Sequence, residues 1–229
     1  MTWIRLRQVA LVARDLDAVV ADLGRELGLQ VAFNDPAVAT FGLRNAVLPV
    51  GTQFVEVVSP TKEGTAAGRQ LDRLGGDGGY MVICHTDEHE QVRARAEELG
   101  MRKVLDADEH GYKIMQLHPS DTGGSFLEID FQPGGDDFNG PWMPAGPDWQ
   151  RAVRTETVDG ISGVELRVPD ADKVAARWSE ILALPVVEGV IELDNASLRI
   201  VDGTGGLAAV DLRGSGDGTR RIGGVEFRF

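Results

Sequence analysis

Two glutamates stand in matching sequence contexts 72 residues apart. Glu56 lies in Phe54-Val55-Glu56-Val57 and Glu128 in Phe126-Leu127-Glu128-Ile129, and each run is typical of a β-strand. Because side chains alternate between the two faces of a strand, each glutamate shares a face with a phenylalanine, away from the face that would pack a helix. A carboxylate buried there needs a metal, a proton or a partner. We therefore expect both glutamates to line one pocket.

The same offset organises the first 133 residues. It places Val9-Ala10-Leu11 on Met81-Val82-Ile83, and Glu26-Leu27-Gly28-Leu29 on Glu98-Leu99-Gly100-Met101. Each unit begins with a strand-like run, continues with an aspartate and an amphipathic segment that ends at glycine, and finishes with short strand-like segments. This order predicts two βαβββ units, residues 1–72 and 73–133.

A shorter version of the unit follows. Residues 163–170 predict a strand that leads into a helix, and residues 193–200 and 222–229 predict two hairpins. The segment 134–150 is rich in proline and glycine and predicts a linker, with Trp142 and Trp149 packing it along a domain surface rather than forming a flap over a pocket. The prediction is an α+β protein with a domain at 1–133, the linker at 134–150 and a reduced domain at 151–229.

Composition excludes several classes of function. The chain has 23 Lys and Arg against 36 Asp and Glu, a net charge of −13, which argues against a nucleic-acid partner. Its apolar runs are too short to cross a membrane, and its first residues lack the apolar core of a secretory signal. A single cysteine, Cys84, excludes an internal disulfide and a zinc site of paired cysteines. We expect a cytoplasmic protein with no membrane partner.

Tandem βαβββ units of this pattern resemble the vicinal oxygen chelate superfamily, which includes glyoxalase I, methylmalonyl-CoA epimerase, extradiol dioxygenases and bleomycin-resistance proteins. The stretches that carry the resemblance are Gln8–Asp17 at a unit start and Leu117–Glu128, with its Leu-His-Pro-Ser-Asp-Thr-Gly-Gly run, at a unit end. The resemblance covers most of the chain. It implies cupped, barrel-like antiparallel sheets, a small-molecule ligand, no organic cofactor, and a cup closed within one chain or in a homodimer.

In metal-dependent members of the superfamily, each unit contributes one metal ligand from its first strand and one from its last. The four positions fall on Gln8 and Glu56, and on Tyr80 and Glu128, with Tyr80 where histidine is usual. The resemblance thus implies Gln8, Glu56 and Glu128 as ligands of a divalent Mg, Mn, Ni, Zn or Fe ion. Since a phenol is a poor ligand at neutral pH, three outcomes stay open: a metal with three protein ligands, a metal-free acid–base pair with Tyr80 as hydrogen-bond donor, or a cup that only binds.

The resemblance implies metal-assisted isomerase, epimerase or lyase chemistry on a small oxygen-containing metabolite. Glu56, Glu128 and Tyr80 would be catalytic, and Phe54, Phe126 and His118 would contact the ligand. The alternative is a metal-free binding or sequestration protein of the bleomycin-resistance type. Both functions need an apolar cup, which alternation predicts from this set: Ala10, Val12, Phe54, Val58, Val82 and Phe126, with Cys84 on the Tyr80 face.

The reduced domain lacks the metal pattern. Arg199 and Arg228 stand where the first domain has Glu56 and Glu128, and Gly163 matches Gln8. Cations do not bind a metal ion, so we expect a structural or dimer-forming role for this half rather than an anion site built on the two arginines.

Overall fold

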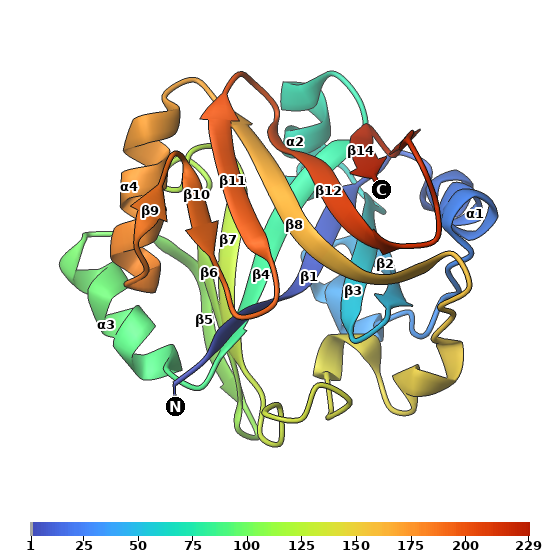
Figure 1. Ribbon diagram of the computed structural model, residues 1–229, viewed down its shortest axis with the longest axis horizontal. Helices are drawn as coiled ribbons and strands as arrows, with labels where there is room; N and C mark the ends of the chain where they lie inside the picture. Colours follow the sequence, from blue (N-terminus) through green and yellow to red (C-terminus); the bar gives the residue numbers. More distant parts are fainter. Residues whose placement is uncertain (1) are drawn as a thin grey trace.

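The computed structural model describes residues 2–229, and its strands form two seven-stranded sheets (Figure 1). In the first sheet the strand order is β2-β3-β1-β4-β7-β6-β5. Its strands are β1 (Ile4–Val12), β2 (Leu43–Val50), β3 (Gln53–Pro60), β4 (Gly78–Thr86), β5 (Lys103–Glu109), β6 (Tyr112–Leu117) and β7 (Phe126–Phe131). β1 pairs in parallel with β3, β4 pairs in parallel with β7, and β1 and β4 run antiparallel at the centre. The two predicted units are therefore joined through their first strands.

The second sheet repeats this arrangement with the order β13-β14-β12-β8-β11-β10-β9. Its strands are β8 (Val158–Val168), β9 (Val186–Val187), β10 (Val190–Glu192), β11 (Ser197–Asp202), β12 (Gly206–Gly214), β13 (Thr219–Ile222) and β14 (Val225–Arg228). β8 pairs in parallel with β11 and β12 with β14, while β8 and β12 are antiparallel. The predicted α+β class with tandem units is confirmed, and the last unit has strands but no helix between β12 and β13.

Four α-helices accompany the sheets: α1 (Leu16–Leu27), α2 (Ala66–Leu74), α3 (His89–Glu98) and α4 (Ala171–Leu182). The Asp15 and Asp170 side chains cap α1 and α4 by accepting from backbone N–H groups of the first turn. α2 was not predicted, because its short sequence contains Gly68 and has little apolar surface. Thr65 caps its first turn. None of the helices in the described part of the chain is long and apolar enough to cross a membrane.

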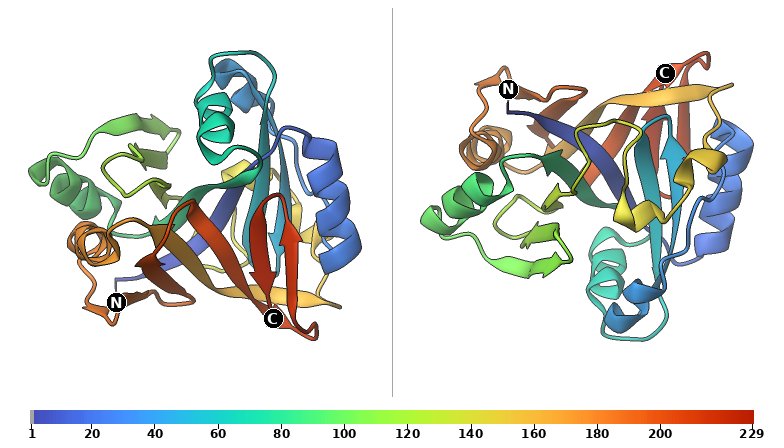
Figure 2. Two further views of the ribbon diagram at one scale, coloured as in Figure 1. Left: turned by 90° about the horizontal axis from the view of Figure 1, so that it is seen from above. Right: turned by 90° about the horizontal axis from the view of Figure 1, so that it is seen from below.

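One hydrophobic core lies between the two sheets. It joins Val9, Leu11 and Val82 of the first sheet to Val164 and Phe227 of the second. Figure 2 shows the second sheet on one side of the first and α2 on the other. The first sheet therefore buries one face against the second sheet, and its other face forms a cup that α2 covers in part.

A β-bulge changes which residues of β4 face the cup. Ala10 pairs with Met81 but Leu11 pairs with Gly79, so Tyr80 is an extra residue that turns toward the cup. Beyond it, Val82 and Cys84 lie in the core between the sheets. The predictions of Val82 as a cup residue and of Cys84 on the Tyr80 face are therefore wrong, because strict alternation does not survive an inserted residue.

The bulge also changes which residues correspond between β1 and β4, the first strands of the two units. Gln8 lies opposite Phe54, and the residue that lies opposite Phe126 is Met81. Met81, not Tyr80, is thus the register counterpart of Gln8, one residue beyond the 72-residue offset that relates Phe54 to Phe126.

Candidate functional site

Glu56 is held in the cup by two amide side chains. Gln8 Nε2 donates to Glu56 Oε2 at 2.9 Å, and Asn45 Nδ2 donates to Glu56 Oε1 at 2.7 Å. The indole nitrogen of Trp142 in turn donates to Gln8 Oε1 at 2.8 Å, which fixes the orientation of the Gln8 amide. Burial raises the pKa of Glu56 and the two amide hydrogen bonds oppose that rise. Glu56 is thus a carboxyl group with neutral partners only.

The proline- and glycine-rich segment fills one end of the cup. Trp142 and Trp149 are buried, and both pack on Phe54, with ring centroids 6.3 and 4.9 Å away. Trp142 also meets the edge of Tyr112. The segment packs on the cup face of the first sheet, where the indoles complete an apolar cluster that a half-open cup would otherwise expose to water.

Two buried arginines of β1 attach this segment to the sheet. The Arg7 guanidinium lies 5.2 to 5.7 Å from the rings of Phe54, Trp142 and Trp149, and it donates to the Thr52 carbonyl and to the Phe138 carbonyl of the segment. Burial lowers the pKa of Arg7 to about 9.

Arg5 lies between two rings in the same way, 4.1 Å from the Trp3 ring and 4.3 Å from the Phe138 ring. Sequence reasoning missed both arginines, since their partners lie far along the chain and nothing local marks a basic residue of a strand as buried.

Glu128 lies on the other half of the cup. It is buried, and its Oε2 atom has no hydrogen-bond partner within residues 2–229. Burial raises the pKa of Glu128 to about 7, while hydrogen bonds with Gln116 and Asp130 oppose the rise. Asp130 is two residues further on the same face and accepts from the Tyr112 hydroxyl at 2.6 Å. Burial and the Glu128 charge raise the pKa of Asp130 well above its usual range.

Asp130 was not among the predicted site residues. The alternation that places Glu128 on the cup face of β7 places Asp130 there too, so the signal was present in the sequence. Its buried partner, Tyr112, lies on β6 and carries no comparable signal.

Tyr80 lies between the carboxylates and the covering helix. Its ring meets the edge of Phe126 with centroids 5.0 Å apart, in a cluster with Ala67 and Leu71 of α2. Burial raises the pKa of Tyr80, and the charges of Glu56 and Glu128 raise it further, which places the phenol within electrostatic reach of both. Tyr80 is therefore a neutral hydroxyl that can donate a hydrogen bond.

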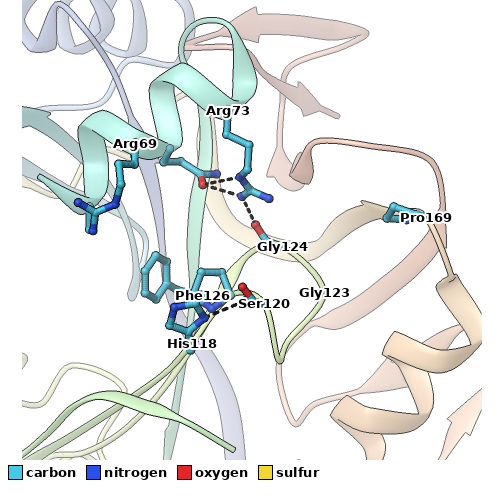
Figure 3. A pocket seen from close by; sticks show the side chains of 11 residues that line it. Arg69, Arg73, His118, Ser120, Gly123, Gly124, Phe126 and Pro169 are labelled. Atoms are coloured by element: carbon cyan, nitrogen blue, oxygen red, sulfur yellow. Dashed lines mark hydrogen bonds between the residues drawn. The ribbon is translucent and has the colours of Figure 1, made fainter. Parts of the chain in front are cut away.

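A pocket of about 500 Å³ opens beside this cluster (Figure 3). Its wall comes from α2, from the loop before β7 with the first residue of β7, and from the residue after β8, with these lining residues: Ala66, Arg69, Gln70, Arg73, His118, Pro119, Ser120, Gly123, Gly124, Phe126 and Pro169. Of the predicted ligand contacts, His118 and Phe126 lie here, whereas Phe54 lies beneath the two tryptophans.

The residues that the superfamily resemblance implies as metal ligands are not arranged as a donor set. Both oxygens of Glu56 accept from amides, and the Gln8 oxygen accepts from Trp142, so each of these atoms already has a hydrogen-bond donor. Met81 stands at the register position opposite Phe126, and a thioether does not suit hard divalent ions. Within residues 2–229 no three His, Cys, Asp or Glu side chains gather as metal donors. This arrangement does not fit a divalent metal.

Comparisons with known proteins agree with the fold. A family model described as a glyoxalase-like domain matches residues 9–182. A Streptomyces coelicolor methylmalonyl-CoA epimerase variant in complex with 2-nitronate-propionyl-CoA is 23% identical, with a TM-score of 0.51 over 57% of this chain and 98% of the epimerase. A hypothetical protein from Staphylococcus aureus is 14% identical, with a TM-score of 0.70 over 99% of this chain and 98% of that one. No curated protein matches the sequence.

Proposed function

Because the chain belongs to the glyoxalase-like domain family of the vicinal oxygen chelate superfamily, we propose that it moves a proton on a carbon next to a carbonyl group of a small molecule. In this proposal Glu128 is the general base and the reaction is an isomerisation or epimerisation without a bound metal. The methylmalonyl-CoA epimerase neighbours are under 25% identical and support the fold alone, so the proposal rests on the residues of the cup.

The observation that carries the proposal is the state of Glu128. Its pKa of about 7 leaves it partly ionised near neutral pH, where a general base is most effective. One of its oxygens has no protein partner within the described residues, so a substrate C–H can approach it without breaking an existing hydrogen bond. When Glu128 takes the proton, the C–H electron pair moves toward the carbonyl oxygen and forms an enolate.

Tyr80 and Glu56 supply the remaining parts of this step. The Tyr80 phenol stays neutral and can donate a hydrogen bond to the enolate oxygen. Glu56 lies on β3 and Glu128 on β7, on the two sides of the central strands β1 and β4. With its pKa raised by burial, Glu56 would take up a proton in place of one of its two amide hydrogen bonds and return it to the opposite face of the carbon. Return to the same carbon gives an epimer, and return to the neighbouring carbon gives an isomer.

Access to Glu128 is supported by the pocket beside α2. Phe126 lines that pocket and precedes Glu128 by two residues on the same face of β7. In this proposal a ligand enters there, lies on Phe126 beside Tyr80, and extends toward the carboxyl group. A volume of about 500 Å³ is within the range of small-molecule sites.

Solvent-exchange experiments test the proposal. The protein is incubated in D₂O with methylmalonyl-CoA and with a panel of 2-oxo acids, and loss of the C–H signal is followed by proton NMR. We expect catalysed exchange for at least one compound and a loss of about a hundredfold or more in Glu128→Gln. Glu192→Gln, an exposed glutamate of β10, is the matched control. Unchanged exchange in Glu128→Gln would overturn the role of this residue.

The alternative function is binding without turnover, which the filled cup favours. Trp142, Trp149 and α2 leave little open space around the carboxylates. Compounds of the panel that bind to the protein without any catalysed exchange would establish this function and overturn the proposed one.

The metal content of the purified protein distinguishes the proposed metal-free step from a metal-assisted one. Because the Glu56 and Gln8 oxygens are engaged, we expect protein purified without chelator or tag metal to hold far less than one divalent ion per chain by plasma mass spectrometry. One ion per chain that is lost in the double variant Glu56→Gln/Glu128→Gln would overturn the metal-free step.

A further inference from the structure

The charge of the pocket beside α2 is opposite to that of the chain. The protein carries a net charge of −13, yet the pocket lining includes two arginines and, within residues 2–229, no acidic residue. Such a local reversal of sign concentrates anions at a concave surface that faces a low-dielectric interior.

The two arginines keep their charge available to a ligand. Arg69 and Arg73 lie one turn apart on α2 and project above His118, Ser120 and Phe126 (Figure 3). Arg73 donates to Gln70 Oε1 and to the Gly124 carbonyl, and Arg69 donates to the Gly64 carbonyl at 2.8 Å. All these acceptors are uncharged, so they position the guanidinium groups without neutralising them.

The opposite wall adds hydrogen-bond donors. His118 Nδ1 accepts from the Ser120 backbone N–H at 3.1 Å, which places the proton of the neutral ring on Nε2 as a donor. The Ser120 hydroxyl also lines the pocket. The two walls thus present guanidinium, imidazole and hydroxyl donors, the set that carboxylate and phosphate oxygens accept from.

We propose that this pocket binds the carboxylate or phosphate group of the ligand, with Arg69 and Arg73 as its charged contacts and His118 and Ser120 opposite them. The carbon chain of the ligand then lies on Phe126 and points toward the cup. Anion binding stands by itself, whereas the identification of the anion as part of a substrate rests on the proposed function.

Another pocket of the protein serves as a control for this proposal. It has a volume of about 650 Å³ and contains Arg213, but Glu192 and Asp194 line it too. Arg213 also pairs with Asp159 at 3.2 Å. We therefore expect no anion preference there, although an arginine is present.

The experiment titrates inorganic phosphate, malonate and its neutral analogue malonamide into the full chain at fixed ionic strength, followed by ¹H–¹⁵N NMR. We expect phosphate or malonate, but not malonamide, to shift the backbone signals of Arg73, Ser120 and Gly124. Comparison of phosphate with malonate shows which anionic group the pocket prefers. The affinity should fall about tenfold or more in Arg69→Gln and further in Arg69→Gln/Arg73→Gln, and Arg69→Lys should recover part of it.

One control variant keeps the outcomes separate. Arg213→Gln should leave anion affinity unchanged, since Arg213 lines the other pocket. Arg69→Gln removes only a contact to an exposed loop carbonyl, so the variant is expected to fold. No shift with either anion, or equal affinity in Arg69→Gln and wild type, would overturn the anion site. Anion binding with no exchange activity would retain the site and overturn the proposed function alone.

Discussion

The two sheets place glutamates on corresponding faces but surround them with opposite partners. On the cup face of the first sheet, Glu56 accepts from the amides of Gln8 and Asn45, and the polar neighbours of Glu128 are Gln116 and Asp130. On the outer face of the second sheet, Glu165 accepts from Arg228 at 2.8 Å and from Arg167 at 2.9 Å. Burial raises the pKa of Glu128 to about 7, whereas the guanidinium groups hold the pKa of Glu165 near 2. The same topology thus holds an acid that binds a proton near neutral pH in the first sheet and an acid that is ionised at neutral pH in the second.

The difference in pKa between Glu128 and Glu165 follows from what covers each face. α2 and the segment that carries Trp142 and Trp149 exclude water from the first cup, and no helix lies over the outer face of the second sheet in Figure 1. Where water is excluded, a carboxyl group retains its proton unless a cation faces it. Arg199 and Arg228 pair with Glu165 and Asp211, so their charges are already engaged by carboxylates.

Removal of the Trp142 ring, which covers part of the first cup, should have the largest effect on stability. Trp142→Ala removes a fully buried ring and leaves a cavity among Phe54, Tyr112 and Trp149, so we expect a loss of about 3–5 kcal/mol in the free energy of unfolding. Urea denaturation measures it. Trp142→Phe is the matched control, since it keeps an aromatic ring and removes the indole N–H bond to Gln8, at a cost of about 1 kcal/mol. Equal, small losses in both variants would show that the segment does not seal the cup.

The pH dependence of stability should have opposite signs in the two sheets. Native Glu128 binds its proton up to about pH 7, above its ordinary pKa of 4.5, so its contribution to stability is present at low pH and is lost as pH rises from about 4.5 to 7. The pKa of Glu165 is lowered to about 2, so its contribution is present above pH 4.5 and is lost as pH falls toward 2.

Urea denaturation across pH 3–8 checks both signs, with an effect of up to about 3 kcal/mol for Glu128. Glu128→Gln should flatten the stability profile between pH 5 and 7, and Glu165→Gln should flatten it below pH 4.5. A wild-type profile that rises between pH 5 and 7 and is unchanged in Glu128→Gln would contradict the raised pKa of that group.

The repeat and the positions of the two glutamates could be predicted from the local sequence. Both depend on period and spacing, which tertiary contacts did not change: Phe54 and Glu56, like Phe126 and Glu128, share a face of one strand. The face of Tyr80 was correct only because the bulge returned it to the cup, and the same bulge moved Val82 and Cys84 to the opposite face. Gly78-Gly79 before Tyr80 is the local signal that could have warned of the bulge.

Other parts of the site depend on contacts between distant segments. Trp142 bonds to a residue of β1 that is 134 positions away, and Arg7 contacts the Phe138 carbonyl 131 positions away. No period or motif within either segment encodes such a pairing, because each partner is ordinary in its own surroundings. Nothing local to Gln8 indicates that its amide is hydrogen-bonded both to an indole and to a carboxylate.

The smallest predicted effect concerns the ion pairs of the second sheet. Arg228 donates to both oxygens of Glu165, at 3.0 and 2.8 Å, so Arg228→Gln leaves this acid with Arg167 and a weaker contact to Arg199. We expect a loss of about 2 kcal/mol at pH 7 by urea denaturation, the range of a charged hydrogen-bonded pair that is partly buried. Arg221→Gln is the matched control, because Arg221 is 70% exposed on the same sheet and its loss should cost less than about 0.5 kcal/mol. Equal losses in the two variants would mean that the Glu165 pairs add no more than surface charges do, and the contrast between the sheets would then rest on the buried acids of the cup alone.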